Sequence, residues 1–113
     1  MEIKYKIWIE KDGKVVFGKG RDDILKAIDE QRSLNAAAKK LEMSYRAAWG
    51  RLKASEKRLG AKLTEVDAVS GRIRMTDDAK ELLRKFDELE KETEAFVEFA
   101  YQKLAFQPRQ KKR

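Results

Sequence analysis

The stretch from residue 33 to residue 63 constrains the fold most, because it reads as two helices joined by a tight turn. Ser33 and Ser44 stand where N-caps are needed, since a serine hydroxyl can accept a hydrogen bond from an unpaired N–H group of a first helical turn. Gly60 stands at the expected C-terminal end of the second helix. Small and apolar residues recur at helical spacing on both sides of the turn, and these inward-facing positions are Leu34, Ala37, Ala38 and Leu41, then Ala48, Leu52, Ser55 and Leu59. The pattern predicts a helix-turn-helix.

The second helix and the residues after it carry most of the positive charge. Residues 44–63 hold six Lys or Arg and one Glu, and so contribute +5 to the formal net charge of +7. If the apolar positions face inward, then at about 100° per residue the outward face consists of Arg46, Gly50, Lys53 and Lys57. This small, cationic face suits the major groove of DNA, whereas a basic helix face alone is usually a solvated surface. Gly50 in mid-helix costs about 1 kcal/mol relative to alanine, which indicates either close approach to the backbone or a tolerated defect.

The segment MSYRAAW, Met43 to Trp49, carries the most specific resemblance to a known family. It resembles the N-terminal domain of ModE-type molybdate-responsive regulators, whose winged helix-turn-helix is itself similar to the LysR-type domain, and the AAAKKLEMS stretch matches this broader class. The resemblance covers roughly the whole chain and implies a winged helix-turn-helix that binds DNA. The segment VDAVSGRIRMT departs from the glycine-rich wing of that family, because it is shorter and stiffer. Of all that the resemblance implies, the DNA contacts of the wing therefore apply least to this chain.

The N-terminal residues alternate as a strand does from residue 2 to residue 17. Ile3, Tyr5, Ile7 and Ile9 lie on one side of this pattern, and Lys4, Lys6 and Trp8 lie on the other. Asp12-Gly13 predicts a hairpin turn before a second strand, Val15 to Phe17, and we expect the neighbouring strand to shield Trp8. Gly18 and Gly20 then predict a loop.

A first helix is predicted from Arg21 to Gln31, with an apolar side made of Ile24, Leu25, Ala27 and Ile28. It supplies the third helix that a helix-turn-helix core needs.

After Gly60, two short strands are predicted at residues 62–66 and 72–75, joined around Ser70-Gly71, at the position and size of a wing. The alternation aims Arg72 and Arg74 to the same side, toward phosphate, the minor groove or solvent.

A long amphipathic helix is predicted from Thr76, which can act as an N-cap, to about Phe106. Its apolar seam steps by three and four residues and consists of Ala79, Leu82, Phe86, Leu89, Thr93, Phe96 and Ala100, widened by Leu83, Val97 and Leu104. So broad a stripe predicts a homodimer, with packing against the chain's own hairpin and first helix as the alternative. Acidic residues outnumber basic ones nine to five on this helix, so we expect it to point away from DNA. Pro108 ends it, and the last residues, RQKKR, form a basic tail that we expect to be disordered.

Composition excludes several classes of function. The 113 residues include no Cys and no His, which excludes disulfides, thiolate or imidazole metal sites and histidine acid–base catalysis. Because a glycine-rich phosphate loop is missing too, we expect no enzyme activity, no cofactor and no metal site. No stretch reaches the roughly 20 apolar residues that cross a bilayer, and no signal-peptide pattern opens the chain, so we expect a cytoplasmic protein without a membrane partner. The length suits one domain without a sensor domain, so we expect no molybdate site within this chain.

Together these patterns predict a mainly helical fold with a small β component, a winged helix-turn-helix with an N-terminal β-hairpin and a long C-terminal dimerisation helix. One domain would span residues 1–106, made of a hairpin (1–20), a three-helix core (21–63), a wing (64–75) and the dimerisation helix (76–106), followed by a basic tail (107–113). The expected function is sequence-specific binding of double-stranded DNA in transcriptional regulation. The alternatives are a protein-interaction module on the same scaffold and binding of structured RNA.

The residues expected to bind DNA come from the turn, the second helix and the wing. They are Ser33, Asn35, Ser44, Tyr45, Arg46, Gly50, Lys53, Lys57, Arg72 and Arg74. Arg46 and Lys53 are aimed at base edges or nearby phosphates, Tyr45 and Ser44 hold the DNA backbone, and Trp49 is a half-buried support. The expected contacts between the two subunits are Leu82, Phe86, Leu89, Thr93, Phe96 and Ala100.

Overall fold

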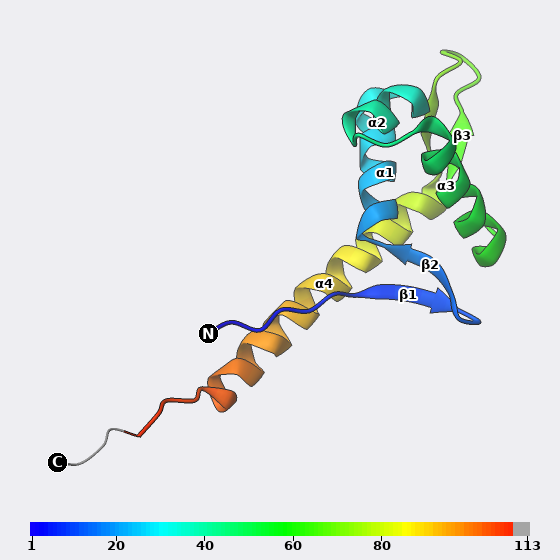
Figure 1. Cartoon of the computed structure of the whole chain (residues 1–113). Coiled ribbons are helices and arrows are strands. Elements are labelled where there is room, and N and C mark those ends of the chain that lie inside the picture. The colour runs from blue at the N-terminus through cyan, green and yellow to red at the C-terminus, as the bar shows by residue number, and fades with distance from the viewer. Residues whose placement is uncertain (110–113) are drawn as a thin grey trace.

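The computed structural model describes residues 1–109 and shows a helix-turn-helix core with two small hairpins, from which one long helix projects (Figure 1). In chain order the elements are β1 (Trp8–Lys11), β2 (Lys14–Gly18), α1 (Lys19–Gln31), α2 (Leu34–Lys40), α3 (Tyr45–Leu59), β3 (Thr64–Val66), β4 (Ile73–Met75) and α4 (Asp77–Leu104). β1 pairs antiparallel with β2, and β3 with β4, in separate two-stranded sheets. This is the mainly helical winged helix-turn-helix that the sequence predicts.

The caps of the helix-turn-helix are confirmed. The Ser33 hydroxyl accepts a hydrogen bond from the Ala36 N–H at 3.2 Å, and the Ser44 hydroxyl accepts one from the Ala47 N–H at 3.0 Å. Gly60 ends α3 in the left-handed conformation, at φ 71°, and its N–H donates to the Glu56 carbonyl at 2.8 Å. These local bonds fix where α2 and α3 begin and where α3 stops.

The first hairpin is shorter than its pattern predicts. The Asp12-Gly13 turn is confirmed, since both residues have the positive φ values, 52° and 76°, that a two-residue turn between antiparallel strands needs. β1 begins only at Trp8, because Trp8 pairs with Gly18, the last residue of β2. Residues 2–7 therefore alternate without a β2 partner, and the strand predicted from residue 2 is wrong over this part.

The loop predicted at Gly18 and Gly20 is also wrong, because β2 passes directly into α1. Gly18 is the N-cap of α1, and Gly20 lies in its first turn. A Cβ atom on Gly18 would lie 3.1 Å from the Trp8 Cβ, so this glycine serves the close approach of the two strands rather than a loop. Trp8 was expected to be shielded, but 51% of its surface is exposed, and its Nε1 donates to Glu10 Oε1 at 2.9 Å.

One hydrophobic core joins the first hairpin, the three helices and the start of α4. Phe17 of β2 and Phe86 of α4 lie at its centre, with their rings edge to face and their centroids 5.2 Å apart. The other buried core residues are Val16, Ile24, Leu25, Ala27, Ile28, Leu34, Ala37, Ala38, Ala48, Leu52, Leu63, Met75, Ala79 and Leu83. The first turns of α4 are thus part of the domain's own core, as the alternative interpretation of the seam expected.

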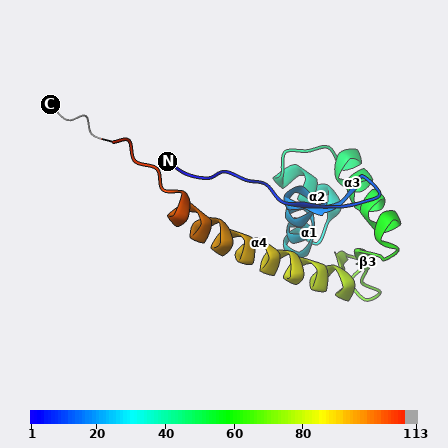
Figure 2. The same cartoon turned by 90° about the horizontal axis from the view of Figure 1, so that it is seen from below.

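The rest of α4 extends away from this core, as both views show (Figures 1 and 2). The N-terminal segment runs back toward the far end of the helix, where the Tyr101 hydroxyl donates to the Met1 carbonyl at 2.6 Å. α4 ends at Leu104, two residues before the predicted end. Of the predicted basic tail, residues 107–109 belong to no helix or strand, and residues 110–113 lie outside the described residues. None of the helices within residues 1–109 combines the length and apolar character needed to cross a membrane.

Candidate nucleic-acid interface

The outward face of α3 is exposed where the sequence places it. Arg46, Gly50 and Lys57 are exposed, while Leu52 and Ser55 on the opposite face are buried. Within residues 1–109, no carboxylate lies within ion-pair distance of Arg46 or Lys57, so both side chains remain available to an anion. The face therefore presents two unpaired cations on one rigid helix.

One edge of α3 carries a ladder of side chains at four-residue spacing. The Tyr45 and Trp49 rings stack, with an interplanar angle of 9° and centroids 6.4 Å apart. The Lys53 ammonium lies 4.3 Å from the centroid of the Trp49 ring and 3.0 Å from Glu56 Oε1. Lys53 lies at the surface and is engaged by two partners of its own chain, whereas the sequence suggested a free side chain aimed at DNA. These residues are spaced i, i+4 in the sequence, and this spacing could have predicted that their side chains lie next to one another on the helix.

Glu56 is the important residue that the sequence pattern missed. It is buried, and its Oε2 accepts hydrogen bonds from the Leu63 N–H at 2.7 Å and the Thr64 N–H at 3.4 Å, which ties the end of α3 to β3. Burial alone would raise the pKa of Glu56, but the Leu63 hydrogen bond and the paired Lys53 stabilise its charged form, so its pKa lies below the ordinary value. Leu59, predicted to face inward, is 36% exposed, because α3 passes beyond the core before it ends.

The two serine hydroxyls predicted to touch DNA are already engaged within the chain. Ser33 and Ser44 both use their hydroxyl oxygens as N-caps. Asn35 and Tyr45 remain exposed in the first turns of α2 and α3. The serines therefore act first as structural residues, which does not prevent their hydroxyl hydrogens from meeting a phosphate.

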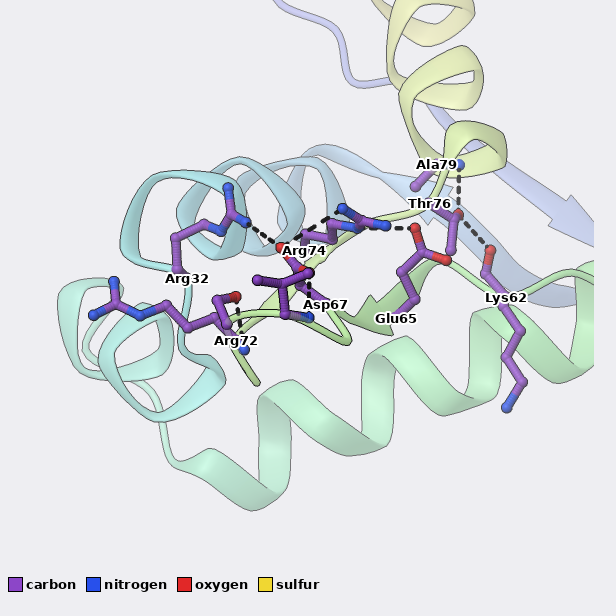
Figure 3. Close-up of polar contacts among 10 residues, drawn as sticks. Arg32, Lys62, Glu65, Asp67, Arg72, Arg74, Thr76 and Ala79 are labelled. Carbon is purple, nitrogen blue, oxygen red and sulfur yellow. Dashed lines mark hydrogen bonds and ion pairs between the residues drawn. The ribbon is translucent and has the colours of Figure 1, made fainter.

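The two wing arginines have different surroundings (Figure 3). Arg74 Nε donates to Glu65 Oε1 at 3.1 Å, and Arg74 Nη1 lies 3.7 Å from Asp67 Oδ2. Arg32 Nη2 approaches the same Asp67 oxygen at 3.9 Å. A backbone hydrogen bond from Val69 and then the charge of Arg74 lower the pKa of Asp67. Arg74 therefore belongs to an ion-pair network, while the Arg72 guanidinium reaches away from it (Figure 3).

A hollow of about 440 Å³ separates the first hairpin from the C-terminal half of α3. It is lined by Lys11, Asp12, Lys14, Ala54, Lys57 and Arg58. Spacing along the sequence does not single out Lys11 and Lys14, because they lie 43 or more positions from Lys57 and only the fold brings them beside it. The cationic surface of α3 thus continues onto the hairpin.

Comparison with known families identifies this arrangement. Residues 23–80 match the family described as bacterial regulatory helix-turn-helix protein, lysR family. The match covers just over half of the chain, from α1 through α2, α3 and the wing into the start of α4. The chain belongs to the LysR family. As a LysR-type helix-turn-helix protein it is a DNA-binding transcriptional regulator.

Solved LysR-type structures share the fold. The CbnR DNA-binding domain in complex with DNA is 25% identical, with a TM-score of 0.55 over 72% of this chain and 94% of that one. OxyR of Corynebacterium glutamicum is 25% identical, with a TM-score of 0.53 over 72% of this chain but only 26% of that one. The BenM DNA-binding domain bound to benA site 1 DNA, 17% identical with a TM-score of 0.56 over 78% and 97% of the two chains, shares the fold alone. No curated protein sequence matches the LysR-type chain.

Proposed function

We propose that this LysR-type chain places the outward face of α3 in the major groove of double-stranded DNA and so selects the sites at which it regulates transcription. The observation that carries the proposal is the exposed stripe of Arg46, Gly50 and Lys57 on a helix capped at both ends. No atom lies within 4 Å of the position that a Cβ on Gly50 would occupy, so the domain itself does not require a glycine there. A DNA backbone or base edge approaching the helix supplies a reason for it.

The side chains of this face have different proposed roles. Arg46, at the second residue of α3, is placed to reach base edges, since recognition helices read DNA mainly from their N-terminal residues. Lys57 lies eleven residues further on, about 16 Å along the helix axis, where the DNA backbone is the expected partner. Lys53 would have to exchange Glu56 for a phosphate, so we assign it a supporting role beside Trp49.

Replacing Arg46 and Lys57 separately should distinguish base reading from phosphate binding. Arg46→Ala should lose about 1–3 kcal/mol of preference for the selected sequence, whereas Lys57→Ala should weaken binding to all sequences alike. The site is obtained by selecting duplexes from a random pool, and affinities are then measured for the selected site, unrelated DNA and duplex RNA. Equal losses on every duplex in both variants would contradict the role of Arg46, and a preference for RNA would favour the structured-RNA alternative.

We also propose that the chain, with residues 1–106 acting as one domain, forms a homodimer through the outer part of α4. Leu89 and Phe96 are 38% and 68% exposed, and the seam between and beyond them includes Thr93 and Ala100. Phe86 was expected in the dimer contact, but only 1% of it is exposed and it packs on Phe17, so we assign it to the core. Leu82 is half-buried at the boundary between the two regions.

Within the LysR-like class, we propose the ModE type, because the resemblance to that type rests on Met43 to Trp49 and extends over roughly the whole chain. The family match at residues 23–80, by comparison, leaves the first hairpin and most of α4 outside it. This assignment concerns the DNA-binding region, and it carries no molybdate site with it.

Molybdate and tungstate should not bind tightly to this chain. Tight binding of an oxyanion needs several donors that converge in an enclosed site. The cationic surface beside α3 is open to solvent, and DNA phosphates would compete for it. Calorimetric titration of each oxyanion into the protein, with and without duplex DNA, should show no saturable binding in the micromolar range and no change in DNA affinity. Saturable micromolar binding would mean that a sensor site exists in the chain or between two copies of it.

A further inference from the structure

The turn of the first hairpin lies beside the C-terminal end of α3, on the side that the proposed function assigns to DNA (Figure 1). We propose that this turn is a second contact with the DNA backbone, in which Lys11 and Lys14 join Lys57 in holding phosphates that flank the groove occupied by α3. The proposal rests on the proposed function and extends it to a segment outside the family match, which begins at residue 23.

Contacts on both sides fix the hairpin against α3. The Lys11 ammonium donates to the Arg58 carbonyl at 3.1 Å, and the Arg58 guanidinium donates to the Val15 carbonyl. Val16 and Phe17 of the same hairpin are buried in the core. The position of the turn is therefore set by the fold, so its lysines can be pre-organised for a partner that α3 also binds.

The charge of this surface fits a polyanion. Four cations and one carboxylate, Asp12, line the hollow between the turn and α3. In the described part of the chain, neither Lys11 nor Lys14 lies within 4.0 Å of a carboxylate oxygen. Asp12 is explained by the turn, because it adopts a positive φ of 52° that aspartate tolerates better than most residues. The hollow keeps a net positive charge without any internal ion pair to Lys11 or Lys14.

Neighbouring arginines add to the positive potential around the junction of the hairpin and α3. Arg21 of α1 donates from Nε to the Ser55 hydroxyl on α3. Burial, followed by the charges of Arg58 and Arg51, lowers the pKa of Arg21. Arg58 and Arg51 are therefore close enough to Arg21 to repel its guanidinium group, a cost that a bound phosphate chain would reduce.

Helix dimensions place the turn at the DNA backbone rather than at the bases. Lys57 lies about 16 Å along α3 from Arg46, whereas the major groove is about 12 Å wide. If Arg46 reaches base edges, Lys57 and the adjoining turn must lie beyond the groove, beside the phosphates at its border. The wing loop extends from the other end of the same side of the molecule, and the outer part of α4 points away from it (Figure 1).

The test is the double variant Lys11→Gln/Lys14→Gln, because glutamine removes the charge but keeps an N–H donor for the Arg58 carbonyl. Binding to a random-sequence 30-bp duplex is measured from 50 to 200 mM salt. We expect about tenfold weaker binding at low salt, and a slope of log K against log salt that is smaller by about 2 per chain, since two phosphate contacts are lost. The matched control is Lys91→Gln/Lys103→Gln on the outer part of α4, which should leave both quantities unchanged.

A tethered cleavage reagent supplies a second readout that does not depend on affinity. The chain has no cysteine, so Lys14→Cys gives a single attachment point for an iron chelate, with Lys103→Cys as its control. Cleavage from position 14 should map to backbone beside the selected site, and cleavage from position 103 should be absent there. A hairpin variant that behaves as the control, together with no cleavage from position 14, would overturn the hairpin contact. Salt-independent binding of the unmodified protein would instead overturn the proposed function.

Discussion

Raising the salt concentration from 50 to 200 mM should weaken binding of this LysR-type chain to duplex DNA about 1,000-fold. Each phosphate that a Lys or Arg neutralises releases condensed counterions, and log K falls by about 0.9 per decade of salt for each contact. If two subunits together engage about six phosphates, the slope is about −5. Lys11, Lys14 and Lys57 of each subunit would supply six such contacts in a dimer, while Arg46 is assigned to base edges.

Fluorescence anisotropy of a labelled duplex at five or more salt concentrations gives the slope directly. The measurement is repeated at fixed ionic strength with a different anion, which separates counterion release from anion competition for the protein. A slope near zero would contradict DNA binding through this surface, whereas a slope of about −2.7, from three contacts, would mean that one subunit binds alone.

Replacing Leu89 and Phe96 together by glutamate should convert the protein to monomers and lower its affinity for the selected site by about 100-fold or more. Both side chains are exposed on the part of α4 that leaves the core. The N-terminal segment does not cover them, because it adjoins Val97 and Tyr101 on another side of the helix. The negative charges of glutamates at these positions would repel the same glutamates of the second subunit across a dimer interface. Each monomer would then bind its half-site separately and weakly, because the two half-site contacts would no longer be linked.

The control variant carries the same added charge away from the seam, at Ala95→Glu and Gln102→Glu. At about 100° per residue Ala95 lies about 100–120° and Gln102 about 120–140° around the helix from Leu89 and Phe96, so the dimer should persist. Sedimentation velocity at micromolar concentration measures the state of each protein, and its melting temperature shows whether the core is intact. A monomeric unmodified protein, or equal loss of dimer in both variants, would contradict the proposed interface.

Sequence reasoning succeeded where the chemistry is local. The caps at Ser33 and Ser44, the left-handed Gly60 and the Asp12-Gly13 turn each depend on a few neighbouring residues, so a spacing rule is enough to find them. The long seam on α4 was found for the same reason. The sequence does not show which part of this seam lies in the core and which part is exposed, because Phe86 is buried only through its contact with Phe17 of the first hairpin.

The missed residues all depend on partners far along the chain or on the end of an element. Glu56 reads as a surface glutamate until the chain folds back and brings the Leu63 N–H to its carboxylate. The lysines of the first hairpin likewise become neighbours of Lys57 only through the fold. Helical periodicity indicates which face of a helix is apolar. It does not indicate which side chain will accept the hydrogen bond of a backbone N–H that becomes buried in the fold.

In the proposed dimer, the junction between the wing and α4 would determine the distance between the two copies of α3. The Thr76 hydroxyl donates to the Lys62 carbonyl at 2.7 Å and accepts from the Ala79 N–H at 3.1 Å (Figure 3). The Thr76 N–H also donates to the Leu63 carbonyl at 3.1 Å. These bonds couple the direction of a helix about 42 Å long to the residues that directly follow α3. A tilt of about 10° at Thr76 would move the far end of α4 by about 7 Å, roughly the length of two base pairs along DNA. Thr76 is therefore the point about which α4 would tilt, and the direction fixed there sets the spacing between the two DNA half-sites in any dimer built on α4.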